Sequence, residues 1–384
     1  MKICDLTQFY SPVSGGVKRY VQEKVDYLRK NRPECEHILI IPGERTERIV
    51  EPQRRIYTIK SPLISRTSRY RMLLNLGAIE NVIELERPAI IESGDPYQVA
   101  WKALATGAAL RIPVVAFYHS HFPEAYLRSV EKYIGKTAGD ALMEAAERYV
   151  RHLYNKFAHT LVPSAGLKQL LVEWGVTNTQ LAELGVNTEV FSPGKREPGF
   201  RRQHGISESA KLLLYVGRLA PEKNVKTLFR AFEILTRVQP NSYHLLVVGD
   251  GTTRDSLMRV PSDSRTWLPY CGDSVELAKI YREADLFVHP GVLETFGLVT
   301  LESQACGTPV VGIHGSYMDR IIYSNQRHWA AENSSESLAE AITNTCREDL
   351  AAIGAEASKM VRQRYDWNAV FDKLLGVYQS SIAE

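Results

Sequence analysis

Cysteine is scarce in this chain, with 5 among 384 residues. The cysteines are odd in number, scattered and without a C-x-x-C pair; they are Cys4, Cys35, Cys271, Cys306 and Cys346. Such usage is typical of reduced thiols in a cytosolic protein, because disulfide frameworks and zinc sites use paired spacings. We therefore expect free thiols, no zinc and a cytoplasmic location.

Long apolar runs and a strong net charge are also missing. No run reaches the length that spans a bilayer, and Met1–Leu6 shows no signal-peptide pattern. A lipid-linked substrate would therefore be met from the membrane surface. The formal net charge of +3 is too small to indicate nucleic-acid binding.

Basic residues do gather in one place, where they outnumber the acidic ones. This basic segment consists of Arg45, Arg48, Arg54, Arg55, Lys60, Arg66, Arg69 and Arg71. A solvated loop is the interpretation that we favour. The alternative is a surface that faces an anionic acceptor or a membrane, with peripheral membrane contact.

Two ligand fingerprints are incomplete. An apolar run at 245–248 ends in a G-x-G at 249–251, but the third glycine of a dinucleotide motif is absent. No D-x-D carboxylate cluster follows a predicted strand, and His119-x-His121 has no third metal ligand near it. We expect neither a dinucleotide cofactor nor a metal ion.

The length of the chain favours two domains, and an apolar content of 44% is enough to fill their cores. Apolar strand candidates alternate with amphipathic helix candidates, as in parallel α/β proteins. A stretch rich in proline, glycine and arginine at 191–205 is typical of a linker. We place the domains at 1–191 and 192–366, followed by a final amphipathic helix at 367–384.

The most informative stretch is 284–312, which reads ADLFVHPGVLETFGLVTLESQACGTPVVG. Leu286–Val288 is a predicted buried strand. Helical spacing begins at Leu298, and Gly307 is placed to cap that helix before the next strand at Val310-Val311. The unit predicted is strand, loop, helix, strand, as in a parallel sheet.

Two carboxylates in this stretch indicate ligand binding. Glu302 falls inside the apolar stripe of the helix, where a carboxylate needs a partner. Glu294 lies at the carboxyl end of the strand, where open α/β sheets bind ligands. The amides near Phe296, Gly297 and Leu298 open the helix and favour an anion. We predict a phosphate site flanked by carboxylates that suit sugar hydroxyls, unless both glutamates turn to the surface.

Three other loops carry candidate groups after predicted strands. Gly15-Gly16 opens a helix and lets backbone amides approach an anion closely. Arg218 and Lys223 lie beside a helix start and suit a diphosphate. His119 follows directly on an apolar strand. Each loop also has a plain explanation, namely a turn, a solvated basic loop and a structural histidine.

Taken together, these motifs resemble those of one family. Glu294 and Glu302, with seven residues between them, and the string CGTPVV at 306–311 resemble the E-x7-E signature of family 4 retaining glycosyltransferases. The segment Gly217–Asn224 resembles their diphosphate motif, and Gly15-Gly16 their glycine loop. The resemblance covers nearly the whole chain and is strongest from 212 to 312.

The resemblance implies the α/β fold known as GT-B, in which two Rossmann-like domains face each other across a cleft. The second domain would hold a nucleotide diphosphate sugar, a UDP- or GDP-hexose such as GDP-mannose. The first would offer a glycan or lipid-linked acceptor, and the last helix would cross back onto it. Transfer would retain the anomeric configuration and need no metal or other cofactor.

The resemblance also implies roles for individual residues. Arg218 and Lys223 would stabilise the departing diphosphate, Glu302 would accept from the ribose, Glu294 would hold the hexose, and His119 would lie near the anomeric carbon. These assignments make His119, Glu294, Arg218 and Lys223 catalytic. The donor-binding set is Gly15, Gly16, Arg218, Lys223, Cys271, Glu294, Phe296, Gly297, Leu298 and Glu302.

Three alternatives remain on the same fold. A nucleotide-sugar epimerase would act without an acceptor, although the E-x7-E string argues against it. A sugar phosphorylase would carry a pyridoxal lysine motif, and none stands out. A non-catalytic nucleotide-sugar-binding protein would bind without turnover.

Overall fold

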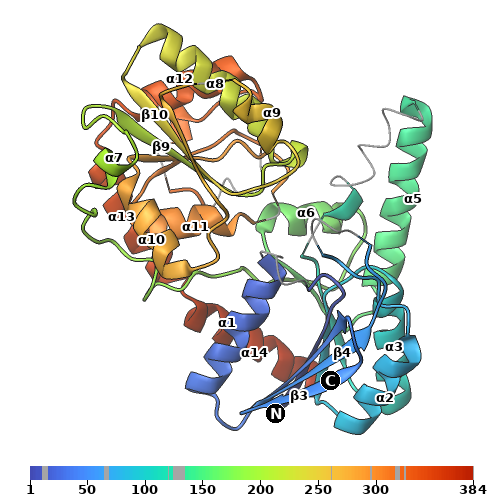
Figure 1. The fold of residues 1–384 in the computed structure, drawn as a ribbon. Helices are drawn as coiled ribbons and strands as arrows, with labels where there is room; N and C mark the ends of the chain where they lie inside the picture. The colour runs from blue at the N-terminus through green and yellow to red at the C-terminus, as the bar shows by residue number, and fades with distance from the viewer. Residues whose placement is uncertain are drawn as a thin grey trace. The chain divides into compact units, whose positions relative to one another are not determined.

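The computed structural model describes residues 1–10, 16–64, 69–119, 121–123, 135–260, 262–294, 296–315, 321–323 and 326–383. The chain forms two compact units (Figure 1): unit 1 combines Met1–Leu184 with Trp367–Glu384, and unit 2 is Gly185–Asp366. Unit 1 thus ends its first segment at Leu184, where the sequence places the boundary at 191. Each unit is an α/β domain on a mainly parallel sheet, so the predicted fold class is confirmed.

Unit 1 has an eight-stranded sheet in the order β3-β4-β2-β1-β5-β6-β7-β8. The strands are β1 (Lys2–Leu6), β2 (Glu36–Gly43), β3 (Glu47–Glu51), β4 (Arg54–Lys60), β5 (Ile90–Ser93), β6 (Val114–Phe117), β7 (Thr160–Val162) and β8 (Thr179–Leu181). Neighbours pair in parallel except β3 with β4. The strand order reverses between β1 and β5, which makes this pair a topological switch point.

Helices cover both faces of this sheet, with α1 and α14 on one side and α2 and α3 on the other (Figure 1). The described helices of unit 1 are α1 (Gly16–Asn31), α2 (Leu76–Glu86), α3 (Gln98–Leu110), α5 (Lys136–Tyr154), α6 (Ala165–Glu173) and α14 (Trp367–Ala383). Ser164 caps the start of α6, since Leu167 N donates to Ser164 Oγ at 3.4 Å. The start of α6 therefore follows from a serine in the N-cap position.

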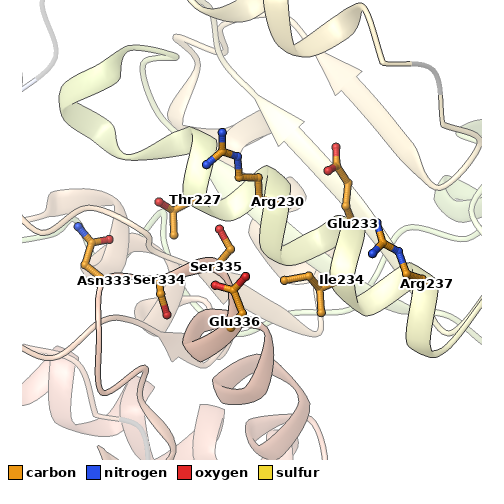
Figure 2. A pocket seen from close by; sticks show the side chains of 9 residues that line it. All are labelled: Thr227, Arg230, Glu233, Ile234, Arg237, Asn333, Ser334, Ser335 and Glu336. Atoms are coloured by element: carbon orange, nitrogen blue, oxygen red, sulfur yellow. The ribbon is translucent and has the colours of Figure 1, made fainter.

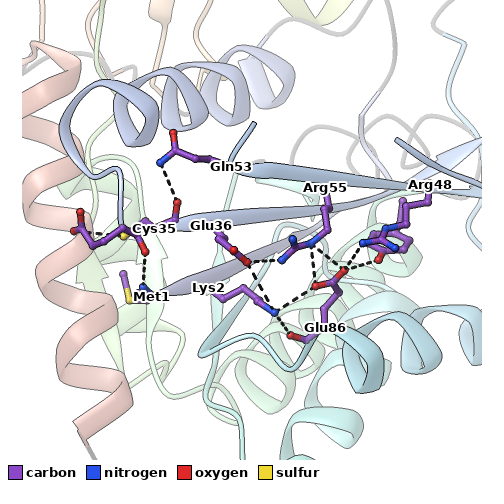
Figure 3. Close-up of polar contacts among 10 residues, drawn as sticks. Met1, Lys2, Cys35, Glu36, Arg48, Gln53, Arg55 and Glu86 are labelled. Carbon is purple, nitrogen blue, oxygen red and sulfur yellow. Dashed lines mark hydrogen bonds and ion pairs between the residues drawn. The ribbon is translucent and has the colours of Figure 1, made fainter. Parts of the chain in front are cut away.

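The charged segment after β2 is not the loop that the sequence favours. Two strands, β3 and β4, form an antiparallel hairpin at the edge of the sheet. Figure 3 shows why so much charge is tolerated there, since Arg48 and Arg55 converge on Glu86 of α2. Arg55 Nε lies 3.0 Å from Glu86, and Lys2 Nζ reaches the same carboxylate at 3.4 Å. Interstrand and helix–strand ion pairs replace the alternating apolar pattern that would have revealed the strands.

Unit 2 has a five-stranded parallel sheet in the order β11-β10-β9-β12-β13. The strands are β9 (Lys211–Val216), β10 (Tyr243–Val248), β11 (Arg265–Leu268), β12 (Leu286–Val288) and β13 (Val310–Val311). Its switch point lies between β9 and β12, which are neighbours in the sheet. The predicted strand–loop–helix–strand unit is therefore present from β12 through α11 to β13.

The helices of unit 2 also form two layers, with α8 and α12 on one face of the sheet and α10, α11 and α13 on the other (Figure 1). They are α7 (Phe200–Gln203), α8 (Val225–Val238), α9 (Arg254–Met258), α10 (Ser274–Glu283), α11 (Leu298–Ala305), α12 (Ser335–Thr345) and α13 (Leu350–Arg364), with short 3-10 helices at Pro221–Lys223 and Gln326–His328. One face of α8 is apolar, and it is buried in the core of the unit. Within the described residues, no helix combines the length and apolarity needed to cross a bilayer.

A buried polar cluster in unit 1 joins the first strand to the last helix. Lys24 of α1, which is 1% exposed, lies 2.8 Å from Asp5 and 3.1 Å from Glu92. Tyr378 of α14 accepts from Lys24 Nζ at 3.0 Å and donates to Glu92. Burial would raise the pKa of the Asp5 carboxyl, but Lys24 and His37 hold it well below its ordinary value. One ammonium group therefore forms ion pairs with carboxylates from two central strands, β1 and β5.

We predict that Lys24→Met lowers the free energy of unfolding by about 3–5 kcal/mol, because it leaves buried carboxylates without their cation. Arg148→Ala is the matched control, since the pair of Arg148 with Glu144 is exposed and is worth about 0.5 kcal/mol. Urea denaturation followed by circular dichroism measures both. Equal losses in the two variants would contradict a stabilising role for Lys24.

Candidate active site

The predicted ligand-binding loops of unit 2 meet at its switch point. Arg218 and Lys223 follow β9, and Glu294 follows β12, the neighbouring strand. Carboxyl ends of parallel strands share one edge of a sheet, so the loops after β9 and β12 come together. Lys223 forms an ion pair with Glu294, which joins two motifs that lie 71 residues apart in the sequence.

The loop that carries Arg218 is fixed by close backbone packing. A Cβ added to Gly249 would lie 2.1 Å from Gly217 O, and one added to Gly251 would lie 2.3 Å from Leu219 O. Only glycine allows backbones to approach this closely. The G-x-G after β10, which fails as a dinucleotide motif, therefore shapes the loop that presents Arg218.

The three charged groups at this edge differ in their surroundings. The side chain of Arg218 is 56% exposed and pairs with Glu222 at 2.8 Å. Lys223 is half-buried against Glu294, whose side chain is only 16% exposed. Burial would raise the pKa of Glu294, but Lys223 and His289 outweigh it and the pKa lies below its ordinary value of 4.5. The edge thus offers two cations and an ionised carboxylate, which suits a ligand with both phosphates and hydroxyls.

Glu302 is buried, as predicted from its place in the apolar stripe, with 2% of the residue exposed. The hydroxyl of Tyr281 in α10 donates to Glu302 Oε2 at 3.0 Å, which holds the carboxylate in place. Helix α11 begins at Leu298, and its N-cap, Gly297, adopts a left-handed φ of 85°. Because Gly297 has no side chain to cap the helix and Phe296 turns inward, the first amides of α11 can face an anion.

His289 is a residue that the sequence reasoning missed. It follows β12 directly and is 5% exposed, and its Nδ1 has no hydrogen-bond partner in the described part of the chain. Burial lowers the pKa of His289 to about 4, so the ring is neutral at physiological pH. A Cβ on Gly291 would lie 2.7 Å from His289 Cε1 and 3.4 Å from Glu294 Cγ, so Gly291 leaves room for both side chains. The available signal was that His289, like His119, directly follows an apolar strand.

The remaining predicted residues are placed as follows. His119 in unit 1 follows β6; its ring stacks on Phe117, with centroids 4.0 Å apart, and meets the edge of Tyr20 at 5.2 Å. Burial lowers the pKa of His119 to about 3, so this imidazole is neutral. Gly16 is the exposed first residue of α1, whereas Gly15 lies outside the described residues.

Cys271 is half-buried in the loop after β11 of unit 2, and its Sγ lies 3.4 Å from Asp273 O. The ring of His121 is buried in unit 1 and contacts the Tyr118 hydroxyl at 3.0 Å. Over the ranges that the structure describes, no group of three or more His, Cys, Asp or Glu residues is arranged to hold a metal ion.

A hollow of about 440 Å³ lies elsewhere in unit 2, between α8 and the start of α12 (Figure 2). Its lining is mostly polar and comes from Thr227, Arg230, Glu233, Ile234, Arg237, Asn333, Ser334, Ser335 and Glu336. None of these residues belongs to the predicted site. Figure 2 shows Arg230 and Arg237 on the α8 side and Glu336 opposite. The hollow is open to solvent rather than enclosed.

Two family models match this chain, one for each half. The model described as Glycosyltransferase Family 4 matches residues 14–190, and the model described as Glycosyl transferases group 1 matches residues 197–363. A GDP-mannose-dependent alpha-mannosyltransferase of Corynebacterium glutamicum is 28% identical over 322 residues, covering 81% of this chain and 72% of the relative. A GDP-mannose-dependent alpha-(1-6)-phosphatidylinositol dimannoside mannosyltransferase of Mycobacterium tuberculosis is 29% identical, covering 89% of this chain and 87% of the relative.

Solved structures agree on the fold. A sucrose-phosphate synthase from Thermosynechococcus elongatus superposes with a TM-score of 0.77 at 19% sequence identity, covering 100% of this chain and 99% of that one. At that identity the likeness concerns the fold alone. The structural neighbours include further glycosyltransferases, and together with the two α/β units of this chain they show the fold to be GT-B.

We predict that Gly291→Ala destabilises the protein by about 1–3 kcal/mol, because the new methyl group must displace the ring of His289. Gly376→Ala is the control, since a Cβ there meets nothing within 4 Å and the residue lies inside α14. That control should be neutral or stabilising by up to about 1 kcal/mol. Urea midpoints of both variants check this, and a Gly291→Ala protein as stable as the parent would refute the close packing of His289.

Proposed function

The chain belongs to the family 4 glycosyltransferases, which use nucleotide-sugar donors, and we propose that it transfers mannose from GDP-mannose to a glycan or lipid-linked acceptor with retention of configuration. The observation that carries the proposal is the Lys223–Glu294 pair at the switch point of unit 2, beside Arg218 and the open start of α11. The names of the relatives support GDP-mannose as the donor.

Different groups at this edge would bind different parts of the donor. Arg218, Lys223 and the first amides of α11 would bind the diphosphate and stabilise the charge that develops on it as it leaves. Glu294 would accept hydrogen bonds from the hexose hydroxyls, and Lys223 would hold that carboxylate while it contacts the diphosphate. Glu302, fixed by Tyr281, would accept from the ribose hydroxyls.

His119 would act as a neutral hydrogen-bonding group near the anomeric carbon. Its ring is wedged between Phe117 and Tyr20, which fixes its orientation. A neutral imidazole can hold a sugar hydroxyl but adds no charge to the oxocarbenium-like centre. The cations of unit 2 would neutralise the negative charge of the leaving diphosphate, which a metal ion does in other enzymes, so the reaction would need no metal.

The basic segment is the part of unit 1 that we propose to face an anionic acceptor or a membrane surface. Four of its arginines pair with carboxylates, namely Arg48, Arg54, Arg55 and Arg71. The exposed cations left for a partner in the described part of the segment are Arg45, Lys60 and Arg69. Any electrostatic contribution to membrane contact is therefore smaller than the sequence suggests, at about 1 kcal/mol for each free cation.

We predict that GDP raises the melting temperature more than UDP does, since specific binding stabilises the folded state by mass action. The enzyme should then release GDP from GDP-mannose when methyl α-D-mannopyranoside is present, give an α-linked product by proton NMR, and tolerate EDTA. Lys223→Ala should lower the rate at least a hundredfold, whereas Lys226→Ala, an exposed lysine outside the site, should not.

Each alternative gives its own result in this assay. Stabilisation by UDP alone would exclude a GDP-mannose donor. A changed sugar nucleotide formed without acceptor would favour an epimerase, and tight binding without turnover would favour a binding protein. Loss of activity in EDTA that magnesium or manganese restores would refute the metal-free mechanism.

The two glutamates should respond differently to substitution. Glu302→Ala removes a contact to the ribose, far from the reacting carbon, so it should mainly raise the KM for the donor. Glu294→Ala should lower kcat more, because it frees Lys223 and misplaces the hexose, and misplacement by ~1 Å can cost about a hundredfold. Glu302→Gln should be milder than Glu302→Ala, since an amide oxygen still accepts a hydrogen bond. Steady-state kinetics measures these effects. If Glu302→Ala abolished kcat at constant KM, the roles assigned to Glu294 and Glu302 would be wrong.

A further inference from the structure

Unit 1 has a switch point of the same kind as unit 2, and a second pair of loops meets there. Gln8 lies in the loop after β1, and Asp95 lies in the loop after β5, the neighbouring strand. The two loops are joined directly, because Gln8 N donates to Asp95 Oδ2 at 2.7 Å. Asp95 therefore occupies in unit 1 the topological place that the candidate donor site occupies in unit 2.

Asp95 is anomalous as a buried carboxylate. It is 2% exposed, and its second oxygen, Oδ1, has no hydrogen-bond partner among the described residues. Among the residues that the structure describes, no cation lies against Asp95, in contrast to the equally buried Asp5 and Glu92, which share Lys24. Burial raises the pKa of Asp95 to about 7. A buried carboxyl oxygen without a hydrogen-bond donor lowers the stability of the folded protein. A ligand that supplies such a donor would restore that stability.

Within the described residues, the hydrogen-bonding groups that act on Asp95 are neutral ones from Thr7, Gln8 and Phe9, and aromatic rings lie in the same loops. Phe9 and Tyr97 meet edge to face with centroids 5.7 Å apart, and Phe9 meets Tyr70 in the same way at 5.6 Å. Gln98 Nε2 donates to Gln8 Oε1 at 3.3 Å, which fixes the loop after β1. A few placed polar groups among aromatic rings are typical of sites for small organic ligands. A phosphate would find no cation in this described neighbourhood and would be repelled by Asp95.

We propose that Asp95 Oδ1 accepts a hydrogen bond from a hydroxyl of the acceptor, and that the acceptor presents a neutral sugar or polyol ring at this point rather than a phosphate. The inference rests on the proposed transfer reaction and names the part of the acceptor that unit 1 recognises. A hydroxyl donor completes the hydrogen bonding of Oδ1 without adding charge. Any anionic group of the acceptor must then lie away from the switch point of unit 1.

The test measures binding of neutral and charged probes to the full chain saturated with GDP. Methyl α-D-mannopyranoside and myo-inositol are the neutral probes, and mannose 6-phosphate is the charged one, with affinity read from ligand-observed NMR titrations. We expect the parent to bind at least one neutral probe more tightly than mannose 6-phosphate. Asp95→Ala should weaken that binding at least tenfold, and Asp95→Asn should weaken it less, because one amide oxygen remains. Asp26→Asn, on the exposed face of α1, is the control and should bind as the parent does.

The outcomes separate this inference from the proposed function. Tighter binding of mannose 6-phosphate, or unchanged binding of the neutral probe to Asp95→Ala, would overturn the inference while GDP binding stays intact. Failure of GDP to bind the parent would instead refute the proposed function. Thermal unfolding at pH 8 checks folding and gives a second readout, since Asp95→Asn should melt higher than the parent once the uncompensated charge is gone. A lower melting temperature would mark Asp95 as a structural residue and count against a ligand.

Discussion

The ammonium group of Lys24 is the constraint on which unit 1 depends. The two central strands, β1 and β5, each bring a carboxylate into the interior, and without a cation either would cost several kcal/mol. Lys24 forms an ion pair with both carboxylates, and Tyr378 of the last helix accepts a hydrogen bond from Lys24. The end of the chain is thereby tied to its beginning. Residues 185–366 then form a unit inserted between two segments of unit 1.

The same cluster is connected through aromatic rings to His119, the predicted site residue of unit 1. Lys24 Nζ lies 4.5 Å from the centroid of the Tyr20 ring, and the edge of Tyr20 meets His119. Tyr20 also donates to Glu92 at 3.1 Å, so its ring cannot turn without breaking a buried hydrogen bond. The orientation of His119 is therefore set by the packing that stabilises the unit. In the proposed reaction, a histidine that contacts the sugar would thus be attached to the most constrained part of the sheet.

Local sequence signals account for most elements, and long-range pairings account for what they miss. The strand β12, the helix α11 and the burial of Glu302 follow from periodicity and from Gly307 after the helix. The strands β3 and β4 do not, because their charged residues interrupt the apolar pattern, and the carboxylate that pairs with two of them, Glu86, is distant in sequence. The Lys24 cluster, the Lys223–Glu294 pair and the surroundings of Asp95 cannot be read from the sequence for the same reason. Each depends on which strands become neighbours, and the order of strands cannot be read from any one segment.

The pairing of Lys223 with Glu294 has a consequence for how a diphosphate could be bound without metal. In the structure Arg218 pairs with Glu222 and Lys223 with Glu294, so these four charges cancel. The two pairs differ in strength, because an exposed pair is worth about 0–1 kcal/mol and is screened by salt, while a half-buried pair is screened less. Arg218 can therefore leave Glu222 at little cost and turn to a diphosphate, whereas Lys223 is better kept beside Glu294. In the proposed reaction Arg218 is the recruited cation and Lys223 the fixed one, joining the hexose carboxylate to the leaving group at the open start of α11.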